Sequence, residues 1–224
     1  GDLAVQMCIA FSIGLYFAFS VRNKPHWLKR CFIWFLPLAA AGSVLACGSR
    51  GGFLAFGVVL FLLWWESKRK IIGVILLAGF LFSLPFVMSD RDKGRLRDMG
   101  GSEDITALNR LERWEKGLKM TKRHPFLGVG YGNWGVADQW YFGGTGALSH
   151  NIFIECMSEL GYIGLAAFIL LIISTIRNNL ETMRISESLN NDFLYFLAKS
   201  LNLSLAAYLA AGFFVTILFY PYFW

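Results

Sequence analysis

The sequence carries little charge for its length. Only 16% of its 224 residues are Asp, Glu, Lys or Arg, whereas about a quarter is usual in a globular domain. Hydrophobic residues make up 56% of the chain and aromatic residues 17%, and the mean hydropathy is +0.50. This composition excludes a soluble domain of this size and indicates an integral membrane protein.

Patterns that hold metals or disulfides are also lacking. The four cysteines, Cys8, Cys31, Cys47 and Cys156, show no Cys-x-x-Cys or Cys/His spacing, so we predict buried, unreactive thiols. Three histidines without clustered aspartates argue against a Zn or Mg site, and we expect neither a metal nor another cofactor. Because basic residues flank membrane spans for topological reasons, the net charge of +6 predicts no nucleic-acid partner.

Apolar runs, most of them long enough for a helix to span a membrane, account for most of the chain. They are Leu3–Val21, Phe32–Cys47, the shorter Gly52–Trp65, Ile71–Met88, Asn151–Ile176 and Phe193–Phe219. We therefore predict an all-α membrane protein of about six transmembrane helices. Residues 1–88 would hold four of them, residues 89–150 one large loop, and residues 151–224 the last two. The N-terminus has no basic region or cleavage site of a signal peptide, and we expect the C-terminal part of a longer protein.

The short loops predict the orientation. Their basic residues are Arg22, Lys24, Lys29 and Arg30, then Lys68, Arg69 and Lys70, then Arg177 and Arg184. If the spans alternate, all of these lie on one side, which the positive-inside rule assigns to the cytoplasm. Arg50 and the large loop then lie on the outer, periplasmic face.

The large loop predicts one amphipathic helix followed by irregular chain. Asp104 or Thr106 can cap a helix that runs to about Arg123, with apolar residues at helical spacing. After Pro125, repeated glycines predict irregular chain up to the fifth span. The segment Gly128–Asn133 matches neither a P-loop nor a dinucleotide-binding motif, so we interpret it as a shaped turn.

Three sites in this outer region could carry chemistry. Arg50 lies between glycines in the tight turn after the second span, where a ligand could approach the backbone; the alternative is an arginine that snorkels at the interface. Arg110 and Arg113 on the loop helix could donate paired hydrogen bonds to phosphate oxygens. For Arg113 the alternative, a solvated helix face, is favoured.

His150 is placed at the predicted first turn of the fifth span, followed by Asn151 and Glu155. Ionisable groups at the head of a membrane helix are costly and usually functional or paired. An imidazole can take a proton from a hydroxyl group near neutral pH. The alternative is a histidine that only satisfies hydrogen bonds.

Several motifs in order resemble those of the O-antigen ligase/polymerase superfamily with its Wzy_C-type domain, over roughly residues 40–175. They are Ser49-Arg50-Gly51, Asn109-Arg110-Leu111-Glu112-Arg113-Trp114, His124-Pro125-Phe126-Leu127-Gly128-Val129-Gly130-Tyr131-Gly132-Asn133, Ser149-His150-Asn151-Ile152-Phe153-Ile154-Glu155 and Glu159-Leu160-Gly161-Tyr162-Ile163-Gly164. Each motif alone is weak, but the ordered set is specific. Members usually have more spans, so the resemblance also implies a missing N-terminal half.

The resemblance implies a GT-C-type glycosyltransferase of the bacterial inner membrane that works without a metal or a nucleotide sugar. It would move a glycan from undecaprenyl diphosphate to a hydroxyl of lipid A-core, of a growing glycan or of a protein. The family's arginines match Arg50 and Arg110, with Arg113 second, because Arg usually lies four residues ahead of Trp. Its histidine matches His150, and Asn151 and Glu155 would support the site.

Other functions remain open at this point. O-antigen polymerases and protein O-oligosaccharyltransferases share these motifs. A polysaccharide transporter or flippase would line its pathway with ionisable residues in the middle of spans, whereas here they collect at one face. A structural membrane subunit without chemistry would tolerate substitution of Arg50 and His150.

Overall fold

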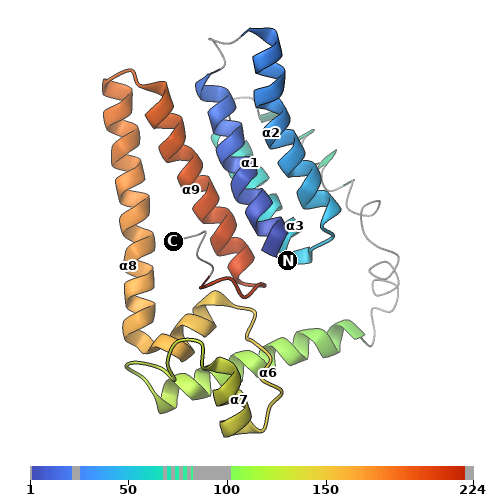
Figure 1. Cartoon of the computed structure of the whole chain (residues 1–224), viewed down its shortest axis with the longest axis vertical. Coiled ribbons are helices and arrows are strands. Elements are labelled where there is room, and N and C mark those ends of the chain that lie inside the picture. Colours follow the sequence, from blue (N-terminus) through green and yellow to red (C-terminus); the bar gives the residue numbers. More distant parts are fainter. Residues whose placement is uncertain are drawn as a thin grey trace. The chain divides into compact units, whose positions relative to one another are not determined.

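The computed structural model describes residues 2–21, 26–67, 70–71, 74–75, 78–79, 82 and 102–219, and only the backbone of residues 50 and 102–107. Its helices are α1 (Asp2–Ser20), α2 (Trp27–Ala46), α3 (Arg50–Glu66), α6 (Ser102–Arg123), α7 (Trp134–Phe142), α8 (Ile152–Ser188) and α9 (Asp192–Gly212) (Figure 1). These ranges contain no strand. The predicted all-α fold is confirmed.

The helices have the length and apolar surface of membrane spans. Four of those described, α1, α2, α8 and α9, are long and apolar enough to cross a membrane, and Gly51–Glu66 of α3 is a shorter apolar helix. On α2, Phe32 and Leu38 are 77% and 67% exposed, as a lipid-facing surface requires. The chain is thus an all-α integral membrane protein. The expected span Ile71–Met88 lies largely outside the described residues.

The cysteine prediction is only partly right. Cys8 and Cys156 are buried, Cys47 is intermediate, and all four thiols are free. Cys31 is exposed because it lies on α2, which turns large apolar side chains outward. An apolar run on a membrane helix therefore does not predict burial within the protein.

The chain divides into two compact units. The first comprises residues 1–89 with Ser174–Ala211, and the second comprises Asp90–Ile173 with residues 212–224. In the first unit α1 approaches α3 closely, since a Cβ on Gly52 would lie 2.3 Å from the Cβ of Ala4. Glu66 links three helices, because its Oε2 accepts a hydrogen bond from Tyr16 at 3.1 Å and lies 2.9 Å from Lys199 Nζ on α9.

The second unit has a small core of its own. Met120 from α6 and Trp134 from α7 are both fully buried, and Ala137 lies beside them. Val129 and Ile154 pack against this cluster from the glycine-rich turn and from α8. The loop helix therefore packs against α7 and the start of α8 through Met120, whereas Leu108, Leu111 and Leu118 are 62%, 57% and 43% exposed.

The fifth span is broken, contrary to the expected continuous helix Asn151–Ile176. Gly161 has φ 69° and ψ −169° inside α8, and Figure 1 shows the short first part of α8 leaving the long part at an angle. Tyr162 N donates to Pro125 O at 2.8 Å, and a Cβ on Gly161 would lie 2.3 Å from Phe126 O. The break lets the turn after α6 dock against the helix backbone.

Two further expectations are wrong. The glycine-rich segment after Pro125 is not irregular throughout, because it contains α7, which ends at Gly143 in the left-handed conformation (φ 60°). The last span does not reach Phe219: α9 ends at Gly212, and residues 213–219 form turns and irregular chain. Buried Ile217 and Leu218 in that segment explain its apolar sequence without a longer helix.

Candidate functional site

His150 lies in a left-handed turn two residues ahead of α8. Its φ is 53°, which costs a residue with a side chain about 1–2 kcal/mol. The cap of α8 is Asn151, whose Oδ1 accepts hydrogen bonds from Phe153 N at 2.9 Å and Ile154 N at 3.2 Å. The expectation that His150 occupies the first helical turn is therefore wrong, because the Asn151 cap leaves it outside the helix.

The segment 213–219 brings His150 and Arg110 together. His150 Nδ1 lies 3.1 Å from Thr216 Oγ1, and the Arg110 guanidinium lies over the Phe214 ring, 5.8 Å from its centroid. Two residues of chain span at most about 7 Å, so both predicted site residues contact one short stretch. Within the described residues Arg110 forms no ion pair and is only partly exposed.

Three side chains hold the carbonyl groups that precede His150. Trp134 Nε1 donates to Ala147 O at 3.0 Å and Trp114 Nε1 donates to Ser149 O at 3.0 Å. Between them, Arg113 Nη1 lies 3.5 Å from Leu148 O. Arg113 and Trp114, at the end of the Arg-Leu-Glu-Arg-Trp sequence of α6, thus fix the backbone that leads into His150.

Asp138 fixes the second glycine-rich stretch. The buried carboxylate accepts a hydrogen bond from Gly146 N at 2.9 Å and lies 3.4 Å from Lys116 Nζ. Lys116 also pairs with Glu112 at 3.0 Å. The hydrogen bond to Glu112 raises the pKa of Lys116, and the charge of Asp138 adds to this against the effect of burial.

The glycine turn after α6 is docked on α8 through its backbone. Val129 N donates to Ser158 O and Gly130 N donates to Glu159 O, both at 2.9 Å. A Cβ on Gly128 would lie 2.3 Å from the carbonyl carbon of Glu159. The N–H groups that a phosphate-binding loop would offer already have protein acceptors, which agrees with a shaped turn.

Two buried carboxylates lie in the first part of α8. Glu159 is 1% exposed and accepts hydrogen bonds from Gly132 N at 2.8 Å and Trp134 N at 2.9 Å. Its negative charge therefore lies at the N-terminus of α7, where the helix dipole favours it. Glu155 is 3% exposed, and its Oε2 has no hydrogen-bond partner among the described residues.

Arg50 is the first residue of α3, and its side chain lies outside the described residues. Ser49 caps the helix by accepting a hydrogen bond from Gly52 N at 3.3 Å. The sequence suggested that glycines here admit a ligand, but Gly52 instead admits Ala4 of α1. Because Arg50 belongs to the first unit, its joint action with Arg110 and His150 remains a prediction.

Comparison with known protein families gives a match to the model of the O-antigen ligase domain, Wzy_C, over residues 35–169. That range is more than half of the chain. The chain belongs to the O-antigen ligase family. The resemblance read from its motifs is thereby confirmed, and family membership indicates a role in glycan transfer at a membrane. A search of curated proteins finds no match.

The O-antigen ligase domain includes all three predicted site positions, Arg50, Arg110 and His150, but ends before Phe214 and Thr216. These two contacts could not be found from motifs, since no motif covers the last segment. The region described contains no group of three His, Cys, Asp or Glu side chains suited to a metal ion.

Proposed function

We propose that this O-antigen ligase family member transfers a glycan from undecaprenyl diphosphate to an acceptor hydroxyl at the periplasmic face of the bacterial inner membrane. The observation that carries the proposal is the contact of Arg110 and His150 with one segment, through Phe214 and Thr216. A cation and a proton acceptor are the two groups that displacement of a diphosphate by a hydroxyl requires. Lipid A-core is the proposed acceptor.

The arginines act on the leaving group. As the bond between the anomeric carbon and the diphosphate oxygen breaks, its electron pair leaves with the diphosphate, and Arg110 and Arg50 stabilise the negative charge. Arg110 is suited to this because its guanidinium rests on an aromatic ring and keeps its hydrogen-bond donors for the ligand. Arg113 is a secondary donor, since one of its nitrogens is directed to Leu148.

His150 acts on the acceptor. The acceptor oxygen bonds to the anomeric carbon while its proton passes to the imidazole, so a single displacement inverts the anomeric centre. Thr216 Oγ1 lies 3.1 Å from Nδ1 and helps to orient the ring. Asn151 supports this geometry as the cap beside His150, and Glu155, one turn into α8, offers a carboxylate oxygen without a hydrogen-bond partner among the described residues.

The test is a transfer assay with the full-length protein in membranes, purified undecaprenyl-diphosphate glycan and lipid A-core. His150→Ala and Arg110→Ala should each lower transfer by at least about a hundredfold. His26→Ala and Arg184→Ala are matched controls, because both residues are exposed and lie outside the proposed site. Transfer at the wild-type rate in the two site variants would show that the assignment is wrong.

Changing the acceptor separates the other members of the superfamily. A polymerase would extend the glycan on its own carrier, and a protein O-oligosaccharyltransferase would modify a hydroxyl of a polypeptide. A flippase would move the intact carrier lipid without breaking its diphosphate bond. Detection of free undecaprenyl diphosphate as a product therefore separates every transferase from a transporter.

A further inference from the structure

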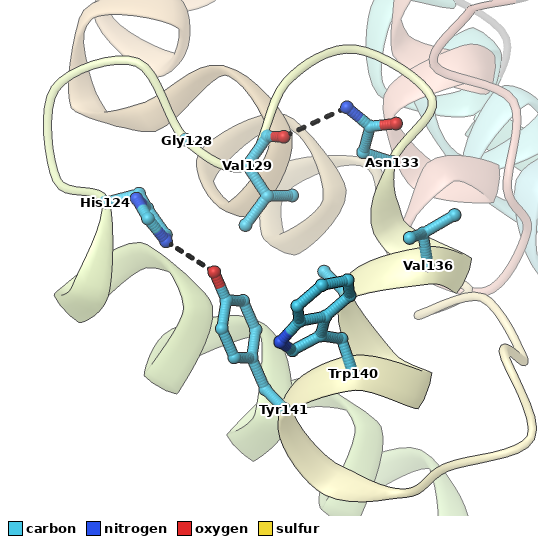
Figure 2. Close-up of a pocket in the computed structure, with 8 residues that line it drawn as sticks. His124, Gly128, Val129, Asn133, Val136, Trp140 and Tyr141 are labelled. Atoms are coloured by element: carbon cyan, nitrogen blue, oxygen red, sulfur yellow. Dashed lines mark hydrogen bonds between the residues drawn. The ribbon is translucent and has the colours of Figure 1, made fainter.

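A hollow of about 290 Å³ lies in the second unit between the turn after α6 and the outer side of α7. Its walls include His124, Val129, Asn133, Val136, Trp140 and Tyr141. In Figure 2, Trp140 and Tyr141 rise from α7 toward His124 and Val129 on the opposite wall. The proposed transfer chemistry uses none of these side chains.

The aromatic wall combines an open ring, Trp140, with a fixed one, Tyr141. Trp140 is 83% exposed although α7 buries Trp134 and Ala137 on its other side. Tyr141 is fixed by a 2.9 Å hydrogen bond between its hydroxyl and His124 Nε2. Asn133 Nδ2 donates to Val129 O at 3.1 Å and closes the rim of the turn. The exposed indole of Trp140 offers a flat apolar face to a ligand.

None of the residues that line the hollow is Asp, Glu, Lys or Arg, and its polar side chains are imidazole, amide, indole and phenol groups. Two charged side chains lie near the hollow: Arg123 rests over the rings of Tyr141 and Phe142 at 4.7 and 5.5 Å, and buried Asp138 is paired with Lys116. The Trp140 indole N–H forms no hydrogen bond with any described residue.

A sugar ring matches this lining. A pyranose has an apolar face of C–H groups, which packs on an aromatic ring, and a rim of neutral hydroxyl groups, which pair with imidazole, phenol and amide groups. The volume is near the lower end of the range for small-molecule sites, about 300–1,000 Å³, and suits one ring rather than an extended chain. We propose that the hollow binds one sugar residue of the transferred glycan at a distance from its diphosphate.

The hollow is tied to the proposed reaction site within one unit. Two of its lining residues, Gly128 and Val129, are fixed to Ser158 and Glu159 of α8 by backbone contacts, and α8 begins two residues after His150. A sugar in the hollow would therefore bind to the same packed segment that carries His150. This inference rests on the proposed function, since it assigns the site to a glycan substrate.

The test compares two donors and one binding probe. With the full-length protein, Trp140→Ala should reduce transfer from the full glycan on undecaprenyl diphosphate on the order of tenfold more than transfer from a single-sugar donor. Binding of the free oligosaccharide, released from the donor by mild acid and followed by saturation-transfer NMR, should weaken by a similar factor. His124→Gln should weaken the same binding, because it disturbs the polar wall.

Trp65→Ala is the matched control, because Trp65 is also a highly exposed tryptophan, at 66%, on α3. Equal oligosaccharide binding by Trp140→Ala and the wild type would overturn the inference, whatever the rate of transfer. If Trp140→Ala loses transfer from both donors equally and its oligosaccharide binding is unchanged, the inference is also overturned, since the indole of Trp140 would then only stabilise the structure. If the wild-type protein binds the oligosaccharide, with weaker binding in Trp140→Ala, but transfers no glycan, the proposed function is contradicted and the sugar site still stands.

Discussion

Thr216 should position His150 for catalysis, and its replacement has a calculable effect. Thr216→Val keeps the shape of the side chain but removes the hydroxyl that lies 3.1 Å from His150 Nδ1. One neutral hydrogen bond contributes about 0.5–1.5 kcal/mol, which corresponds to about a two- to tenfold change in rate. The hydrogen bond is lost at His150, whose left-handed backbone already costs about 1–2 kcal/mol. Without it, we expect the imidazole to adopt other orientations.

The assay is the initial rate of glycan transfer at saturating acceptor, with donor concentration varied. For Thr216→Val we expect kcat to fall within that range while the KM for the donor stays unchanged, because Thr216 contacts the histidine and not the diphosphate site. Thr216→Ser should restore the rate, since it retains the hydroxyl. A Val variant that transfers as fast as the wild type, or a Ser variant as slow as Val, would refute the positioning role.

Three further substitutions test the scaffold of the site. Trp114→Phe keeps the ring but loses the hydrogen bond to the carbonyl ahead of His150, so unfolding free energy should fall by about 1 kcal/mol and transfer should slow. Gly161→Ala should lower the thermal midpoint in detergent far more than Gly132→Ala, because both have positive φ but only the first would bring a Cβ to 2.3 Å from Phe126 O. Glu159→Gln should leave one backbone N–H without its acceptor, costing about 1–3 kcal/mol, and should speed proteolysis of the glycine turn; unchanged cleavage would contradict that contact.

The membrane helices could be predicted because hydropathy is a local property of the sequence. The runs Leu3–Val21 and Gly52–Trp65 correspond to α1 and α3 within two residues at each end. The break in α8 could not be predicted in the same way, since it depends on backbone contacts with residues more than thirty positions earlier. A glycine after Glu159-Leu160 in an apolar run was the available signal.

The candidate site also contains residues that the sequence predicts and residues that only the structure reveals. Motif order was enough to select Arg110 and His150, which the structure brings to one segment. Their partners Phe214 and Thr216 lie in an apolar stretch for which hydropathy predicts a membrane helix. That this stretch is not part of α9 depends on tertiary contacts, which the sequence pattern does not show. The role of Glu159 was also missed, because a carboxylate that accepts backbone N–H groups leaves no spacing pattern in the sequence.

Separate measurement of donor binding and single-turnover transfer tests the assigned roles most directly. In the full-length protein, Arg110→Ala should weaken binding of the undecaprenyl-diphosphate glycan on the order of tenfold or more, as loss of a charge-assisted hydrogen bond does. His150→Ala should bind the donor as the wild type does but transfer it at least about a hundredfold more slowly. Wild-type donor binding in Arg110→Ala together with wild-type transfer in His150→Ala would contradict the account.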